Sequence, residues 1–119
     1  MSTTPGSKLQ TAVLKMLLEA GIFAWRQNNQ PTWDPKMNSG YGAYRSHGGL
    51  KGVSDILACV NSVFVAIEIK AGADKISADQ LFFRKRLERS GGTYFIIRSL
   101  DDAKKMITSL SLQAPAQSQ

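Results

Sequence analysis

The fold is decided by the stretch Gly52-Val-Ser-Asp55-Ile-Leu-Ala-Cys-Val60-Asn-Ser-Val63-Phe-Val-Ala-Ile-Glu68-Ile-Lys70. Two apolar runs, 53–60 and 63–70, are rich in β-branched residues and predict two strands. Only Asn61-Ser62 separates them, which favours a two-residue hairpin turn. With that turn, Val60 faces Val63, and the numbers of every further facing pair add up to 123. Asp55 is therefore expected to lie opposite Glu68.

This register brings three charged side chains together. Because side chains alternate between the faces of a strand, Lys70 joins Asp55 and Glu68 on one face. Two carboxylates that face each other across a strand pair repel unless positive charge lies between them. Lys70 supplies one such charge, and a hard divalent cation, which prefers oxygen ligands, is the natural second. The pattern predicts metal-dependent phosphodiester hydrolysis, in which Lys70 orients or deprotonates a water and stabilises the transition state.

The elements on either side predict a mixed α/β fold. Apolar residues at helical spacing predict an opening helix over residues 9–20, and residues 22–27 read as a strand. Ser77 and Gln80 form the signature of a capping box, which starts a helix running to about residue 90. A strand over 93–98 and a helix from Ser99 to about residue 110 follow. The expected order is α-β-β-β-α-β-α, with the strands of Glu68 and Tyr94 parallel in a mixed central sheet flanked by helices.

The length and composition limit the class of protein. At 119 residues, the chain has room for one domain, which we place at residues 7–112, followed by a polar flexible tail at 113–119. The net charge of +6 attracts polyanions, most commonly nucleic acid. The single cysteine, Cys59, cannot form an internal disulfide. No segment resembles a membrane span or a secretion signal, so we expect an intracellular protein without a membrane partner.

The ordered motifs resemble a known family. Gly52-Val-Ser-Asp55, Glu68-Ile-Lys70, Ser77-x-x-Gln80 and Gly91-Gly-x-Tyr94 look like the virus-type replication-repair nuclease (VRR-NUC) domains of the PD-(D/E)xK nuclease superfamily. The resemblance implies a restriction-endonuclease-like fold and Mg²⁺- or Mn²⁺-dependent cleavage of DNA. Asp55, Glu68 and the backbone carbonyl of Ile69 would be the metal ligands. Lys70 would be the catalytic lysine, and Gln80 a supporting catalytic residue.

The resemblance also suggests the substrate. Free-standing members of the family resemble dimeric Holliday-junction resolvases, so a homodimer that cuts four-way DNA junctions is expected. The alternatives are a flap or nicking nuclease of the same superfamily and a DNA-binding module without activity. Two departures stand out: Ser54 replaces the usual proline, and residues 6–10 lack the acidic residue that often supports the metal site.

Several other residues are candidates for DNA contact, because they are basic, polar or aromatic and lie near the predicted site. They are Arg26, Asn28, Tyr44, Arg45, Lys51, Arg84 and Lys85. For the basic side chains of the second helix, a solvent-exposed face is the alternative interpretation. For Gln80, the alternative is a role in the helix cap alone.

Apolar and aromatic residues complete the predictions. Phe82, Phe83 and Leu87 are expected on the buried side of the second helix. Cys59 is expected to be buried, and Trp33 to lie in the core or in a dimer interface.

Overall fold

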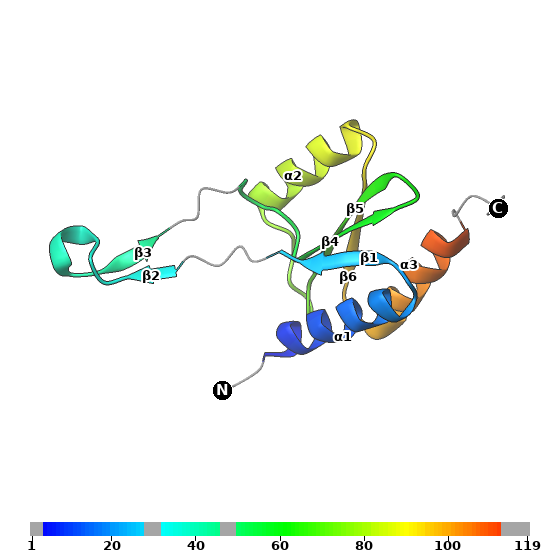
Figure 1. The fold of residues 1–119 in the computed structure, drawn as a ribbon, viewed down its shortest axis with the longest axis horizontal. Helices are drawn as coiled ribbons and strands as arrows, with labels where there is room; N and C mark the ends of the chain where they lie inside the picture. Colours follow the sequence, from blue (N-terminus) through cyan, green and yellow to red (C-terminus); the bar gives the residue numbers. More distant parts are fainter. Residues whose placement is uncertain (1–3, 28–31, 46–49, 113–119) are drawn as a thin grey trace.

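The computed structural model describes residues 4–27, 32–45 and 50–112 of the chain, which form a mixed α/β structure (Figure 1). The elements within these ranges are α1 (Pro5–Glu19), β1 (Phe23–Arg26), β2 (Thr32–Asp34), a 3₁₀ turn η1 (Asn38–Gly40), β3 (Ala43–Arg45), β4 (Ile56–Val60), β5 (Val63–Ile69), α2 (Ala78–Arg89), β6 (Thr93–Ile97) and α3 (Leu100–Leu112). Helix α1 begins earlier than its apolar pattern predicts, because the Thr4 hydroxyl caps it and Pro5 occupies its first turn.

The larger sheet has the strand order β1-β4-β5-β6 and contains both strand orientations. β4 pairs antiparallel with β1 and β5, whereas β5 and β6 are parallel and are connected through α2. Val60 pairs with Val63 and Ile56 with Ile67, so the predicted register is confirmed. Asn61 and Ser62 both have positive φ, at 52° and 71°, as a tight hairpin turn of this kind requires.

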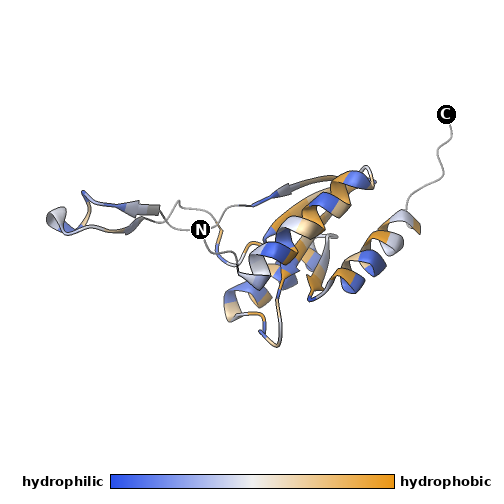
Figure 2. Ribbon diagram, turned by 90° about the horizontal axis from the view of Figure 1, so that it is seen from below, coloured by the Kyte–Doolittle hydropathy of each residue, from blue (hydrophilic) through white to orange (hydrophobic). Residues whose placement is uncertain are grey.

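Helices α1 and α3 cover one face of this sheet. Val13 and Leu17 of α1 and Met106 of α3 pack against strand residues such as Ile56 and Ile67 to form the main core. The hydrophobic residues accordingly gather in the large sheet and on the helix sides that meet it, as Figure 2 shows.

Helix α2 covers part of the opposite face. Phe83 packs there against Leu57, Ala66 and Tyr94 in a second, smaller core. Glu68 lies on this same face, because Leu57, Ala66 and Glu68 share one side of the sheet. The site therefore lies between the sheet and α2.

Two burial predictions are wrong, and both concern the limits of this second core. Cys59 is exposed because α2 does not reach the Phe23–Cys59–Phe64 row of the sheet, where Phe23 is 70% exposed. Phe82 is 62% exposed because α2 turns the neighbouring Phe83 toward the sheet instead.

The predicted order of elements is incomplete. Between β1 and β4 the chain inserts the antiparallel strands β2 and β3, which form a separate two-stranded sheet. This hairpin extends away from the body and gives the molecule a longest dimension of 60 Å, against 32 and 29 Å in the other directions (Figure 1). Among the described residues, no helix is long and apolar enough to cross a membrane.

Candidate functional site

Asp55 and Glu68 lie at the same end of the β4–β5 pair. Glu68 is a strand residue and only 3% exposed, while Asp55 directly precedes β4 and is half-buried. The Asp55 carboxylate accepts a hydrogen bond from the backbone N–H of Ile69 through Oδ2, at 2.9 Å. This bond continues the pairing of the two strands with a side chain, and it holds Asp55 across from the end of β5.

The charges of Asp55 and Lys70 both act on the buried carboxyl of Glu68. The pKa of Glu68 is raised from 4.5 to about 8, with burial as the largest cause. Asp55 contributes to this rise through its negative charge and through a hydrogen bond that only protonated Glu68 can donate, whereas the Lys70 ammonium opposes it. Without a bound cation, Glu68 therefore holds its proton near neutral pH.

Gln80 connects the helix cap to the buried carboxylate. Its backbone N–H donates to the Ser77 hydroxyl at 3.2 Å, and its Oε1 accepts from the Ser77 N–H at 2.8 Å, which completes the predicted capping box. Its remaining polar atom, Nε2, donates to Glu68 Oε2 at 3.0 Å. The two interpretations of Gln80, as a cap and as a site residue, are thus compatible in one conformation.

Two further hydroxyls at this site were not predicted from the sequence. Burial and the charge of Glu68 raise the pKa of Tyr94 to about 12, while Ser54, by hydrogen bonding to the phenolate form, and Arg84 lower it. When Tyr94 is neutral, the buried hydroxyls of Ser54 and Tyr94 have no hydrogen-bond partner. The predicted parallel pairing of the two strands does not fix their register, so it could not place Tyr94, which lies next to Ala66 and on the same face.

The donor set suits a hard divalent cation. When Glu68 is ionised, its buried Oε1 has no hydrogen-bond donor, which is costly unless a cation or the proton itself compensates it. The carbonyl of a strand residue points to the same side as its N–H, so the Ile69 carbonyl faces the Asp55 side. Asp55, Glu68 and the Ile69 carbonyl could therefore hold Mg²⁺ or Mn²⁺ together with waters.

The number of protein ligands is small. In the described part of the chain, no group of three or more His, Cys, Asp or Glu side chains is placed to hold a metal ion. The first turn of α1 contains no acidic residue, although Gly6 lies beside Ala71, the neighbour of Lys70. The residues present thus fit a site with two carboxylates.

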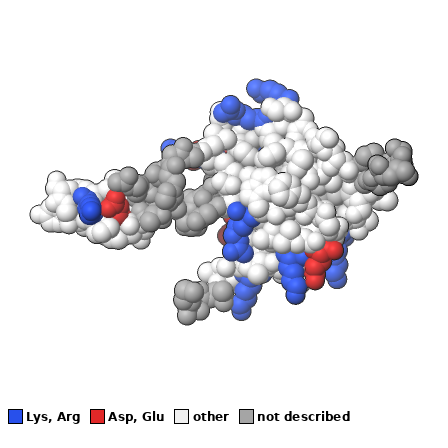
Figure 3. Space-filling view, in the orientation of Figure 1, with Lys and Arg blue, Asp and Glu red and all other residues white. Residues whose placement is uncertain are grey.

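The candidate DNA-contacting residues fall into separate groups. Arg84 lies on the site side of α2, where its guanidinium is 5.3 Å from the centre of the Tyr94 ring and pairs with Glu88 at 3.4 Å. Lys85 is exposed on the same helix. Figure 3 shows basic side chains at the upper edge of the molecule, over α2, and more of them at the lower edge. Lys51 is exposed on the segment that leads into β4.

Two candidates lie away from the carboxylates, and two cannot be placed relative to them. Arg26 points to the α1 face of the sheet, where its Nη2 donates to the Thr11 hydroxyl at 3.0 Å. Tyr44 is 68% exposed on the β2–β3 hairpin. Asn28 and the side chain of Arg45 lie outside the described residues, as does the tail at 113–119.

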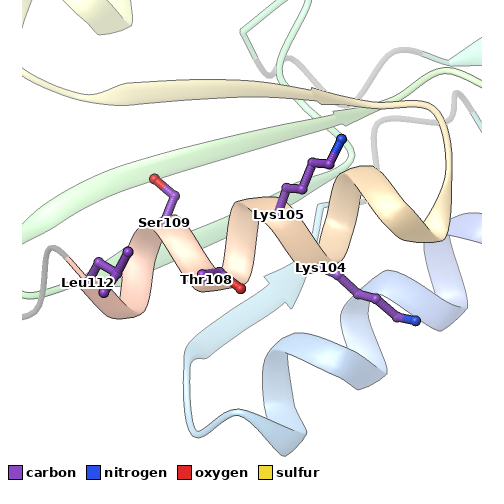
Figure 4. A pocket seen from close by; sticks show the side chains of 5 residues that line it. All are labelled: Lys104, Lys105, Thr108, Ser109 and Leu112. Carbon is purple, nitrogen blue, oxygen red and sulfur yellow. The ribbon is translucent and has the colours of Figure 1, made fainter.

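A depression of about 580 Å³ lies away from these residues. Its five lining side chains all belong to α3, as Figure 4 shows, and they are Lys104, Lys105, Thr108, Ser109 and Leu112. Because α3 covers the other face of the sheet and no acidic residue lines the depression, it has no part in the site described above.

No protein-family model, no curated protein and no solved structure matches this chain.

Proposed function

We propose that this protein is a metal-dependent, structure-selective DNA endonuclease with a restriction-endonuclease-like fold of the VRR-NUC type. The observation that carries the proposal is the buried Oε1 of Glu68, which has no hydrogen-bond donor when the carboxylate is ionised and which lies beside Asp55 and within the field of Lys70. Structural carboxylates in a core are normally paired or hydrogen-bonded through both oxygens. This arrangement instead suits a carboxylate that receives a cation.

Each residue has a distinct task in this proposal. Asp55, Glu68 and the Ile69 carbonyl would hold Mg²⁺ or Mn²⁺, which supplies a Lewis acid for the scissile phosphate when it is bound. The Ile69 N–H fixes the orientation of Asp55, and the Gln80 amide fixes that of Glu68. Lys70 would orient the attacking water, accept or release its proton, and stabilise the negative charge that develops on the phosphate.

The substrate is proposed from charge and resemblance together. The net charge of +6 and the exposed basic side chains of α2 favour contact with DNA phosphates, which gives affinity without sequence preference. A homodimer would present two such sites to a four-way junction and cut paired strands, as two-fold symmetry allows. A flap or nicking nuclease would use the same residues on an asymmetric substrate.

The test is cleavage of labelled four-way junction, flap and linear duplex DNA with Mg²⁺, with Mn²⁺ and with EDTA. We expect metal-dependent paired nicks in the junction and little cleavage of the duplex. Asp55→Ala, Glu68→Gln and Lys70→Ala should each cut at least about 100-fold more slowly. Asp101→Asn and Lys104→Ala, which change exposed residues of α3, serve as matched controls and should cut normally.

The second candidate is a DNA-binding module without nuclease activity. It is favoured by the absence of an acidic residue in the first turn of α1, which leaves only two carboxylates for a metal ion. Protein that binds every branched DNA but cuts none, with either metal, would support this candidate and reject the nuclease. Preferred cleavage of flaps would instead select the flap nuclease.

A further inference from the structure

The β2–β3 hairpin contains a tryptophan whose ring is held in place. Trp33 pairs with Tyr44 across the two strands, and their rings meet edge to face with centroids 5.2 Å apart. The indole also lies directly over Gly42, where an added Cβ would come within 2.3 Å of its Cζ2 atom. Gly42 therefore has to be glycine for the indole to rest on the backbone.

The loop between the two strands is ordered by its own hydrogen bonds. The Met37 carbonyl accepts from the N–H groups of Gly40 and Gly42, and the Asp34 carboxylate accepts from the Lys36 N–H. Trp33 is nevertheless 52% exposed, and Tyr44 and Tyr41 are 68% and 84% exposed. The hairpin thus presents fixed aromatic rings to solvent. The contacts described above order it, although a two-stranded hairpin by itself is only marginally stable.

The position of the hairpin relates it to the carboxylates. β1 leads out to the hairpin at the end of the sheet that carries Asp55, and the Gln27 N–H donates to the Asp55 carbonyl there. The chain returns to the sheet through Lys51 and Gly52, and Gly52 lies three residues before Asp55. The hairpin is therefore inserted between two strand ends that both adjoin the candidate site (Figure 1).

The chemistry of the hairpin favours nucleobases over another protein surface. Aromatic residues are enriched in protein interfaces as well, but the described residues of the hairpin add only Pro35, Met37 and Ala43 as other apolar side chains that could complete an apolar interface centre. Flat exposed rings on a chain with net charge +6 instead match single-stranded nucleic acid, in which bases stack on aromatic side chains and phosphates meet basic ones. In a paired duplex the base faces are hidden by their neighbours.

We propose that Trp33, supported by Tyr44 and Gly42, is a stacking site for the unpaired bases of branched DNA. This inference rests on the proposed function only in taking DNA as the polymer. The hairpin would select branch points by their unpaired bases and bring the adjoining phosphates to Asp55 and Glu68.

Trp33 can report on this contact directly. In a Trp25→Phe, Glu68→Gln protein kept in EDTA, Trp33 is the single tryptophan and no cleavage occurs. We expect an oligothymidine strand and a four-way junction with unpaired central bases to quench its fluorescence strongly. A blunt duplex of equal length should quench it little. The matched Trp33→Phe protein reports from Trp25, which packs against the second core, and should show no difference in quenching between the single strand and the duplex.

Affinity gives the second measurement. Trp33→Ala should weaken binding of the oligothymidine strand about 5- to 150-fold, the loss expected for one stacked base. Gly42→Ala keeps every aromatic ring but displaces the indole, and should weaken binding in the same direction. Gly40→Ala is its matched control, because Gly40 also has positive φ but no atom within 4 Å of an added Cβ.

Other results would overturn the inference. Equal quenching by single strand and duplex, or unchanged affinity of Trp33→Ala for the single strand, excludes base stacking. A loss of dimer mass in sedimentation for Trp33→Ala, with DNA affinity intact, shows that the hairpin binds a second copy instead. Strong quenching in a protein that cuts no DNA would reject the nuclease and leave the stacking site standing.

Discussion

The buried carboxyl of Glu68 makes stability depend on pH. Its pKa is raised from 4.5 to about 8 by burial and by Asp55, so the folded state holds this proton more tightly than the unfolded chain. The resulting contribution to the free energy of unfolding is fully present below pH 4.5. It is lost as the pH rises to about 8, by at most about 1.4 kcal/mol per pH unit.

Glu68→Gln should remove this dependence, because glutamine does not titrate. Urea unfolding in EDTA at pH 5, 6, 7 and 8 should give a falling stability for the parent and a flatter profile for the variant, which becomes the more stable protein at pH 8. Asp101→Asn, on an exposed turn of α3, should keep the slope of the parent. Parallel profiles for parent and Glu68→Gln would contradict the role of Glu68.

At the same scale, the sequence was sufficient to predict the positions of the charged residues, but not which residues lie next to them. Asp55 and Glu68 were predicted to face each other because a two-residue turn fixes the register of a whole hairpin. The pairing of β5 with β6 is not set by a turn, so the residues opposite Glu68 and Ala66 could not be specified. Tyr94 and the hydroxyl of Ser54 therefore appeared only in the structure.

The first turn of α2 allows the cap and the site to be separated. Ser77→Ala removes the acceptor for the Gln80 N–H but leaves the Gln80 amide that donates to Glu68. It should cost about 1 kcal/mol of stability and little activity. Gln80→Ala removes both functions, so it should cost similar stability and also weaken Mn²⁺ binding, measured by calorimetry. Equal Mn²⁺ affinities for the two variants would show that Gln80 serves only the cap.

Gly52 joins the entrance of β4 to α2. It has φ +78°, and an added Cβ would lie 2.2 Å from the carbonyl oxygen of Asp79, in the helix turn that carries Gln80. Gly52→Ala should therefore cost about 2 kcal/mol or more, since backbone atoms have to move. Gly21→Ala has the same φ but open space, and should cost about 1 kcal/mol. Thermal unfolding checks both, and equal losses would exclude the contact.

At the scale of elements, local sequence patterns were enough to predict the packed helices and strands, but not the exposed hairpin. Capping residues and apolar spacing predicted all three helices, and the strand runs predicted the four strands of the large sheet. The β2–β3 hairpin has no counterpart among the predicted elements, because glycines and prolines interrupt residues 28–51. The alternation of side chains along a strand indicates which face of the sheet Cys59 occupies. It does not indicate how far α2 covers that face, so the exposure of Cys59 could not be predicted.

For the whole molecule, charge predicts how DNA binding responds to salt. If Lys85 contacts a phosphate, Lys85→Gln should lower the slope of log affinity against log salt concentration by about one, measured on a four-way junction. Lys104→Gln changes the net charge equally, but it lies on α3 in the opposite layer. The slope for this variant should match that of the parent. Identical slopes for both variants would place the DNA elsewhere.

The uncovered end of the sheet has a practical consequence for biochemists who purify this protein. A single solvent-facing thiol at Cys59 can be oxidised by air into a covalent link between two chains. Such a product would migrate on a gel as a pair whether or not the native molecule associates. Preparations in reducing agent, or with the sulfur alkylated beforehand, are the ones whose measured mass reports genuine self-assembly.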